Sequence, residues 1–385
     1  LDYYEDSADE LAVINYTSGT SGFSKGVMIP YRAIFSNLQF AQEVIPGLDN
    51  TKSVVSMLPS AHMYGLMFEV MYELSAGAHV HFLSRVPSPK IIMQALAEVK
   101  PYIIIAVPLV IEKIYKSKVK PVLEKAGIKF MMKLPGLDQV VMNKIRAELV
   151  NAFGGEFYEV IIGGAAFNKE VEAFFKKMGF PFTVGYGMTE CAPIITYDDW
   201  QKSKLYSCGK AAPNMEIKID SSDPENVPGE VMVKGANVFL GYYKNDEATS
   251  AVLGGDGWFR TGDMGVIDSD GALFLKGRSK CMILGPSGQN IYPEEIETVI
   301  NTRPYVIDSL VIEDDGGLTA LIYPDFPQGE ADGMPQEVFS KFMMDSLPEL
   351  NKELPNYARI KKIEIMPEDF ERTPKKSIKR YLYQR

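Results

Sequence analysis

The sequence is poor in the residues that build metal centres and disulfide frameworks. It has three cysteines and three histidines in 385 residues, at Cys191, Cys208, Cys281, His62, His79 and His81. The cysteines show no metal-ligand spacing, and the histidines are too few and too scattered for a convincing zinc site. We therefore expect reduced thiols in a cytoplasmic protein and no zinc centre.

Long apolar runs and an excess of positive charge are also missing. The apolar segment from Tyr102 to Ile111 is much shorter than a membrane span and is broken by Pro101 and Pro108. The formal net charge is −10, which argues against non-specific binding to nucleic acid but is compatible with a nucleotide ligand. We expect no nucleic-acid partner and no integral membrane segment, and peripheral contact with a membrane stays open. The sequence starts at Leu1, and we expect no signal peptide.

The pattern of predicted helices and strands changes twice along the chain. Strand patterns alternate with helical patterns up to about Asp198, which favours a layered α/β architecture with a largely parallel sheet. Short β-like runs between Gly, Pro and Asp clusters then indicate a small barrel or antiparallel sheet, and a last unit starts near Lys280. We predict three parts, at 1–198, 199–279 and 280–385. The helical patterns cover 29–44, 112–127, 139–153, 168–178, 293–302 and 336–347, and the strand patterns cover 11–14, 53–57, 77–83, 102–107, 158–162, 215–219, 230–233, 309–312 and 318–323.

A loop of glycines and hydroxyl residues with one lysine follows the first strand pattern. It reads Thr17-Ser18-Gly19-Thr20-Ser21-Gly22-Phe23-Ser24-Lys25. Glycines let backbone N–H groups approach an anion, hydroxyls add donors, and the lysine adds a positive charge. The loop is not a Walker A motif, because no glycine directly precedes Lys25. It predicts a phosphate site. The alternative is a flexible surface linker, which would need neither the strand nor the lysine.

Further motifs follow in a fixed order and extend to the end of the chain. They read Leu58-Pro59-Ser60-Ala61-His62-Met63-Tyr64-Gly65, Gly163-Gly164-Ala165, Thr183-Val184-Gly185-Tyr186-Gly187-Met188-Thr189-Glu190, Trp258-Phe259-Arg260-Thr261-Gly262-Asp263, Gly277-Arg278-Ser279-Lys280, Asn290-Ile291-Tyr292-Pro293-Glu294-Glu295-Ile296-Glu297 and Thr373-Pro374-Lys375-Lys376-Ser377-Ile378-Lys379-Arg380. With the loop, these strings resemble the signatures of the adenylate-forming superfamily, which includes acyl-CoA synthetases, peptide-synthetase adenylation domains and luciferases. The motif at Asn290 and the lysine at 280 are most similar to those of long-chain fatty acid–CoA ligases.

The resemblance implies a fold as well as a site. The expected fold is α/β, with a layered αβαβα large N-terminal domain, a small β-barrel subdomain and a small mobile α+β C-terminal domain. Superfamily members carry a substantial segment before the phosphate loop. We therefore expect the large domain to be partial here, with its front end absent.

The resemblance also implies the residues of an ATP site. Tyr186 would place its ring against adenine, and Asp263 would accept hydrogen bonds from both ribose hydroxyls. Glu190 and Thr17 would hold Mg²⁺, and Glu190 and Lys25 would be catalytic. Taken singly, each motif could instead be a plain strand and turn or an exposed turn with a surface ion pair. The ATP-binding residues would be Thr17, Ser18, Gly19, Thr20, Ser21, Gly22, Lys25, Gly164, Ala165, Gly185, Tyr186, Gly187, Met188, Thr189, Asp263 and Arg278.

Three more roles follow from the same resemblance. His62 would line the acyl pocket, although a lone histidine is more often a structural residue. Lys280 falls at the hinge of the C-terminal domain. Gly288 would lie in the coenzyme A channel.

The tail departs from the superfamily pattern at its most important position. Ser377 stands where a catalytic lysine is expected, and Lys376 stands where a glycine is expected. A shift of one residue moves a Cα by about 3.8 Å, which a flexible lysine stem can largely absorb. We expect Lys376 to act as the catalytic amine, with Lys375 as the second choice. The alternative is a solvated basic tail without a catalytic role.

The function implied is an ATP-dependent, AMP-forming ligation of a fatty acid, expected to be long-chain, to coenzyme A through an acyl-adenylate. Its cofactors and substrates would be ATP, Mg²⁺, coenzyme A and the fatty acid. Three alternatives stay open: a ligase for another carboxylate, an acyl-AMP ligase that loads a carrier protein, and a nucleotide-binding pseudoenzyme.

Overall fold

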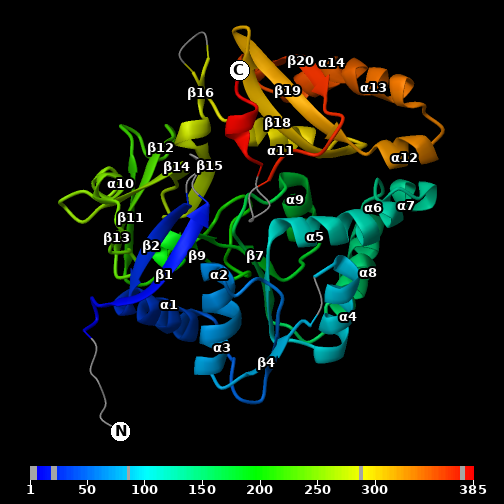
Figure 1. Cartoon of the computed structure of the whole chain (residues 1–385). Helices are drawn as coiled ribbons and strands as arrows, with labels where there is room; N and C mark the ends of the chain where they lie inside the picture. Colours follow the sequence, from blue (N-terminus) through cyan, green and yellow to red (C-terminus); the bar gives the residue numbers. More distant parts are fainter. Residues whose placement is uncertain (1–6, 19–23, 85–86, 286–288, 373–377) are drawn as a thin grey trace.

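The computed structural model describes the chain except for residues 1–6, 19–23, 85–86, 286–288 and 373–377. Figure 1 shows a mixed α/β molecule in which the C-terminal strands and helices lie together above the rest of the chain. The predicted α/β fold with a small C-terminal α+β unit is thus confirmed. No helix among the described residues is long and apolar enough to cross a membrane.

The chain begins with an antiparallel hairpin that frames the predicted phosphate loop. Strand β2 pairs with β1 and with β13, and the hairpin register aligns Thr17 with Lys25. The prediction started a helix at Ile29, whereas the strand runs to Pro30 and the helix α1 starts at Tyr31. The strand is favoured because the β-branched Val27 and Ile29 alternate and are fully buried on one face. These elements are β1 (Leu11–Ser18), β2 (Ser24–Pro30), α1 (Tyr31–Val44) and β13 (Gly241–Tyr242).

Parallel strands form the centre of the first half of the chain, as predicted. β3 pairs with β4, β5 pairs with β6, and β6 pairs with β7, all in parallel. The Tyr102 N–H donates to the Ser53 carbonyl at 2.8 Å and links the two groups. β5 and β6 are buried throughout, as expected of strands covered on both faces. The elements are β3 (Ser53–Ser56), α2 (Met63–Leu66), a π-helical turn (Met67–Met71), α3 (Tyr72–Ser75), β4 (His79–Phe82), α4 (Pro89–Val99), β5 (Ile103–Ala106), α8 (Leu137–Ala152), β6 (Glu159–Ile162), α9 (Lys169–Lys177) and β7 (Phe182–Val184).

The single helix predicted over 112–127 is wrong. The segment folds as α5 (Pro108–Ile114), a π-helical turn (Tyr115–Val119), α6 (Lys120–Leu123) and α7 (Ala126–Met131). Pro121 lacks the N–H that a continuous helix would need, and the wider π turn directly before it absorbs the break.

The middle of the chain is an antiparallel sheet of order β11-β12-β14-β15. The strands β11 and β15 do not pair with each other among the described residues, so the sheet stays open and no barrel closes. A sheet of four strands is too small to close into a barrel around a side-chain core. The elements are β8 (Tyr186–Gly187), β9 (Ile194–Tyr197), β10 (Lys210–Ala211), β11 (Met215–Asp220), β12 (Gly229–Gly235), α10 (Asp246–Ser250), β14 (Phe259–Ile267) and β15 (Leu273–Arg278).

The C-terminal region has its own sheet and its own core. β19 pairs antiparallel with β18 and parallel with β20, and the helices α11, α13 and α14 pack against this sheet around Phe339 and Ile300. The elements are β16 (Ile283–Leu284), β17 (Asn290–Ile291), α11 (Pro293–Ile300), β18 (Val306–Asp314), β19 (Gly317–Pro324), α12 (Phe326–Ala331), α13 (Gln336–Asp345), α14 (Leu347–Glu353) and β20 (Ile360–Ile365).

Candidate active site

Two of the predicted motifs leave the sheet at the carboxyl ends of neighbouring parallel strands. Gly163, Gly164 and Ala165 follow β6, and the segment 185–190 follows β7. The Gly185 N–H donates to the carbonyl of Ile162 at 2.9 Å, which ties the two segments together. Open α/β sheets bind ligands outside the carboxyl ends of their strands, so this edge is where a nucleotide is expected.

Glycine is required at two of these positions. Gly164 has φ +87°, and it is exposed together with Ala165. A Cβ at Gly187 would overlap the carbonyl oxygen of Pro193. Met188 is half-buried and Thr189 is buried. The backbone of the loop can therefore approach a ligand at Gly164, while the segment after β7 packs tightly on its neighbour.

Asp263 lies at the centre of the first side-chain cluster. Its Oδ2 accepts a hydrogen bond from the Tyr186 hydroxyl at 2.5 Å, and its Oδ1 pairs with Arg278 Nε at 2.8 Å. Asp263 and Arg278 face each other across β14 and β15, so sheet register brings the two motifs together. Asp263 is only 6% exposed, and this burial raises the pKa of its carboxyl, against the opposing effect of Arg278 and Tyr186.

Glu190 lies at the centre of the second cluster. Its Oε1 accepts a hydrogen bond from the Tyr242 hydroxyl at 2.9 Å, and Lys25 Nζ lies 4.5 Å from the centroid of the Tyr242 ring. The ring thus holds a carboxylate at its hydroxyl and an ammonium on its face. Thr17 is half-buried and faces Lys25 across the hairpin. Sequence reasoning missed Tyr242, because a lone tyrosine on a two-residue strand carries no pattern.

The oxygen atoms available at Glu190 suit a metal ion that also binds phosphate. No group of three or more His, Cys, Asp or Glu side chains in the described part of the chain could hold a metal alone. Glu190 Oε2 accepts no hydrogen bond from the residues that the structure describes, and Mg²⁺ commonly uses one or two carboxylates together with substrate phosphates. Mg²⁺ therefore fits here only in company with a nucleotide.

The stretch around His62 packs beside the same edge. The carbonyl of Ala61 accepts a hydrogen bond from Asn15 Nδ2 at 2.9 Å, and the Tyr64 hydroxyl donates to the Ile161 carbonyl at 3.1 Å. A Cβ at Gly163 would lie 3.3 Å from the Tyr64 ring. The half-buried His62 directly precedes helix α2. Tyr64, which belongs to the same motif, was overlooked as the residue that joins this stretch to the glycine loop.

Lys280 is exposed in a single 3-10 turn (Ser279–Cys281) between β15 and the C-terminal region. Beyond it, Glu295 of α11 pairs with Lys169 Nζ at 3.4 Å and with Lys276 Nζ at 3.5 Å. All three side chains are about one third to one half exposed. Such pairs contribute about 0–1 kcal/mol each, so these two ion pairs hold the C-terminal region only weakly.

The tail returns to α11 through Arg380. Its guanidinium pairs with Glu297 and, at 3.8 Å, with Glu294. Arg372 and Ile378 form an antiparallel bridge on either side of the segment that holds the candidate amines.

Several predicted residues lie outside the described part of the chain. They are Gly19, Thr20, Ser21, Gly22, Gly288, Lys375, Lys376 and Ser377; the backbone of Ser18 is described as the end of β1, and nothing is said of its side chain.

Comparison with known proteins agrees with these motifs. The family model described as AMP-binding enzyme matches residues 3–243, and the model of the AMP-binding enzyme C-terminal domain matches residues 282–385. A 4-coumarate–CoA ligase-like protein of Oryza sativa subsp. japonica is 32% identical over 79% of this chain and 51% of its own length. Long-chain-fatty-acid–CoA ligase 1 of Saccharomyces cerevisiae is 30% identical over 82% of this chain and 48% of its own length. The chain thus spans about half the length of these relatives.

Solved structures show the same fold. ATP-bound MatB from Rhodopseudomonas palustris superposes with a TM-score of 0.76 at 24% identity, over 100% of this chain and 69% of that one. O-succinylbenzoate coenzyme A synthetase from Bacillus subtilis, in complex with ATP and magnesium ion, gives a TM-score of 0.75 at 24% identity, over 97% of this chain and 70% of that one. With family models matched on both sides of the predicted hinge, the chain belongs to the family of AMP-binding enzymes.

Proposed function

We propose that the protein is an AMP-forming acid–thiol ligase that joins a fatty acid to coenzyme A through an acyl-adenylate. One observation carries the proposal. Residues far apart in the sequence form two side-chain clusters. In one, Asp263 contacts Tyr186 and Arg278. In the other, Tyr242 contacts Glu190 and Lys25. An acid that holds ribose, an acid that holds a metal–phosphate group and a cation for phosphate are what adenylation requires.

In the first step a carboxylate oxygen attacks the α-phosphorus of ATP and pyrophosphate leaves with the electrons of the broken P–O bond. The attacking group is already an anion near neutral pH, so no general base is needed. The barrier comes from bringing two anions together, and positioned cations lower it. Lys25, held over the Tyr242 ring, supplies one such cation. When bound, Mg²⁺ would neutralise phosphate charge at Glu190 and Thr17.

Lys376 is proposed as a second cation for this step. Ile378 and Arg380 keep their family positions, and Arg380 is anchored on α11 by Glu294 and Glu297. The tail is therefore attached to the C-terminal region next to the candidate amine. Lys375 is the second choice.

In the second step the sulfur of coenzyme A attacks the acyl carbonyl, AMP leaves, and the thiol proton passes to solvent. We propose that residues 280–385 rotate about Lys280 between the two steps and bring Gly288 to the thiol channel. The weak ion pairs of Glu295 permit such a motion at low cost. The parts 1–198 and 199–279 are proposed to stay together as the nucleotide- and acyl-binding body, with His62 at the acyl pocket.

The relatives are named for different acids. The yeast relative is named a long-chain-fatty-acid ligase, and the rice relative is named 4-coumarate–CoA ligase-like. A ligase for another carboxylate, or one that loads a carrier protein, is therefore the second candidate. A nucleotide-binding pseudoenzyme is the third, because of Ser377. The free thiols of the three cysteines fit a cytoplasmic location, which stays a prediction.

The test is ATP–pyrophosphate exchange with a panel of acids. We expect exchange with saturated fatty acids and little with coumarate or succinylbenzoate. Exchange with one of the latter alone would replace the fatty acid as substrate. ATP binding without exchange for any acid would favour the pseudoenzyme. Thioester formation with a carrier protein, but not with coenzyme A, would change the acceptor.

A further inference from the structure

One segment of this acidic protein has the opposite charge. Between residues 113 and 134 there are seven lysines and a single acid, Glu124, although the whole chain has a formal net charge of −10. This lysine segment (residues 113–134) covers the π-helical turn after α5 together with α6 and α7. Its lysines are Lys113, Lys116, Lys118, Lys120, Lys125, Lys129 and Lys133.

The charges of the lysine segment are not neutralised within the described part of the chain. Elsewhere Lys100 and Lys169 pair with glutamates at 2.9 and 3.4 Å, whereas none of the seven lysines has a described carboxylate oxygen within 4.0 Å. All of them are exposed except the half-buried Lys120. The nearest acid outside the segment, Glu112, is mostly buried, and its Oε1 accepts a hydrogen bond from the Asn168 N–H at 3.0 Å. The segment therefore presents several exposed ammonium groups that form no ion pair with a described carboxylate.

Large apolar side chains stand among these charges. Phe130 is 65% exposed, and Leu134, Leu137 and Val140 are also exposed around the turn from α7 to α8. Lys125, Lys129 and Lys133 repeat at intervals of four residues, and Phe130 and Leu134 repeat in the same way one position later. Basic and apolar side chains thus alternate around one short helix and its following turn. Figure 1 places α7 at the outer margin of the molecule.

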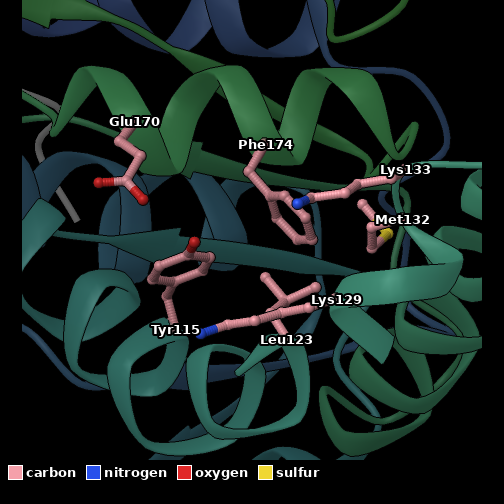
Figure 2. A pocket seen from close by; sticks show the side chains of 7 residues that line it. All are labelled: Tyr115, Leu123, Lys129, Met132, Lys133, Glu170 and Phe174. Atoms are coloured by element: carbon pink, nitrogen blue, oxygen red, sulfur yellow. The ribbon is translucent and has the colours of Figure 1, made fainter. Parts of the chain in front are cut away.

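A hollow of about 390 Å³ opens beside this helix. Tyr115, Leu123 and Phe174 form most of its apolar lining, and the side chains of Lys129 and Lys133 extend into it (Figure 2). Glu170 lies at the far end. The hollow therefore combines an apolar floor with two cations and, at its far end, one carboxylate.

We propose that the lysine segment docks the protein on an anionic lipid surface, with Phe130 and Leu134 inserted between headgroups and the lysines on lipid phosphates. A membrane interface offers both hydrocarbon and negative charge at the depth of one short helix. Nucleic acid or an acidic peptide would pair with the lysines but would leave the exposed Phe130 and Leu134 without an apolar partner. The docking is independent of the ligase reaction.

The test is sedimentation of the full chain with vesicles of phosphatidylcholine, alone or with one third phosphatidylserine. We expect binding to the anionic vesicles only, and release by high salt, because exposed charges are screened. Each lysine near an anionic surface contributes a factor of about five, so the double variant Lys129→Ala/Lys133→Ala should bind about 30-fold more weakly. The matched control Lys90→Ala/Lys341→Ala removes two exposed lysines elsewhere, neither of which forms an ion pair with a described residue, and should bind like the parent.

The variant Phe130→Ser tests the apolar part separately. It should weaken binding to the anionic vesicles by about tenfold, the effect of withdrawing one large apolar side chain from hydrocarbon. An exposed position should tolerate the change, and unfolding midpoints of all variants should match the parent. The proposal is overturned if the parent ignores anionic vesicles, if it binds both vesicle types equally, or if the control pair loses as much as Lys129→Ala/Lys133→Ala. Binding to RNA or to an acidic peptide with no vesicle binding would overturn it as well.

Discussion

Replacing Asp263 by alanine should weaken nucleotide binding by about 1.5–3 kcal/mol, the range for hydrogen bonds to a charged group. In Kd this is a rise of about 10- to 150-fold. Each carboxylate oxygen already has one partner, Tyr186 or Arg278, and each can accept a second bond from a ribose hydroxyl. Titration calorimetry with a non-hydrolysable acyl-adenylate analogue measures the effect.

The same substitution also affects the fold, and the two effects must be separated. Removing a carboxylate that is 6% exposed leaves the buried Tyr186 hydroxyl without its acceptor, at a cost of about 1–3 kcal/mol in unfolding free energy. The Arg278 side chain is 47% exposed and can regain water. Tyr186→Phe is the matched control, because it removes the same internal hydrogen bond and keeps the carboxylate. It should weaken binding much less. Unchanged affinity in Asp263→Ala, or an equal loss in Tyr186→Phe, would remove Asp263 from the site.

Three further predictions use other groups. Glu190→Ala should raise the KM for Mg-ATP strongly, and it should also cost about 1–3 kcal/mol in unfolding free energy, because it leaves the buried Tyr242 hydroxyl without its acceptor. Glu216→Ala, at an exposed glutamate, should change neither, and equal kinetics in the two variants would refute the metal assignment. Lys376→Ala should slow acyl-adenylate formation and spare thioester formation from supplied acyl-adenylate. Ser377→Lys should match or exceed the parent in acyl-adenylate formation. If Lys376→Ala leaves adenylation intact, Lys376 does not replace the lysine expected at position 377. Burial raises the pKa of Glu69 from 4.5 to about 8, so the folded state holds its proton more tightly than the unfolded state and stability falls as pH rises from about 5 to 8. Glu69→Gln should reduce that fall by on the order of 3 kcal/mol in denaturant titrations, and an unchanged pH slope would contradict the buried, protonated carboxyl.

The motifs could be found from the sequence because their chemistry is local. A phosphate loop needs glycines, hydroxyls and a lysine within a few residues, and Asp263 and Arg278 each stand in a short recognisable string. The two side chains are in contact because β14 pairs with β15, and neither sequence motif predicts this pairing. Tyr242 is the clearest omission, since its partners Glu190 and Lys25 come from distant parts of the chain.

The errors in the predicted fold have similar causes. The apolar spacing over 112–127 suits a helix, and Pro121 was the local sign that it breaks. The alternation of Val27 and Ile29 indicates a strand. The prediction instead took Pro30 as a helix start signal and began the helix at Ile29. Barrel closure depends on strand number and curvature, which short β-like runs do not specify. The roles of Lys376 and Gly288 rest on the sequence alone, because both lie outside the described residues.

The most direct test of an acyl-adenylate intermediate is the fate of the carboxyl oxygens. With a fatty acid labelled with ¹⁸O in both carboxyl oxygens, attack on the α-phosphorus leaves one labelled oxygen bound to phosphorus, and thiol attack then releases it with AMP. We expect one ¹⁸O in AMP for each thioester formed, and none in pyrophosphate, when the products are analysed by mass spectrometry. Unlabelled AMP, or the release of ADP and labelled phosphate, would contradict an acyl-adenylate intermediate.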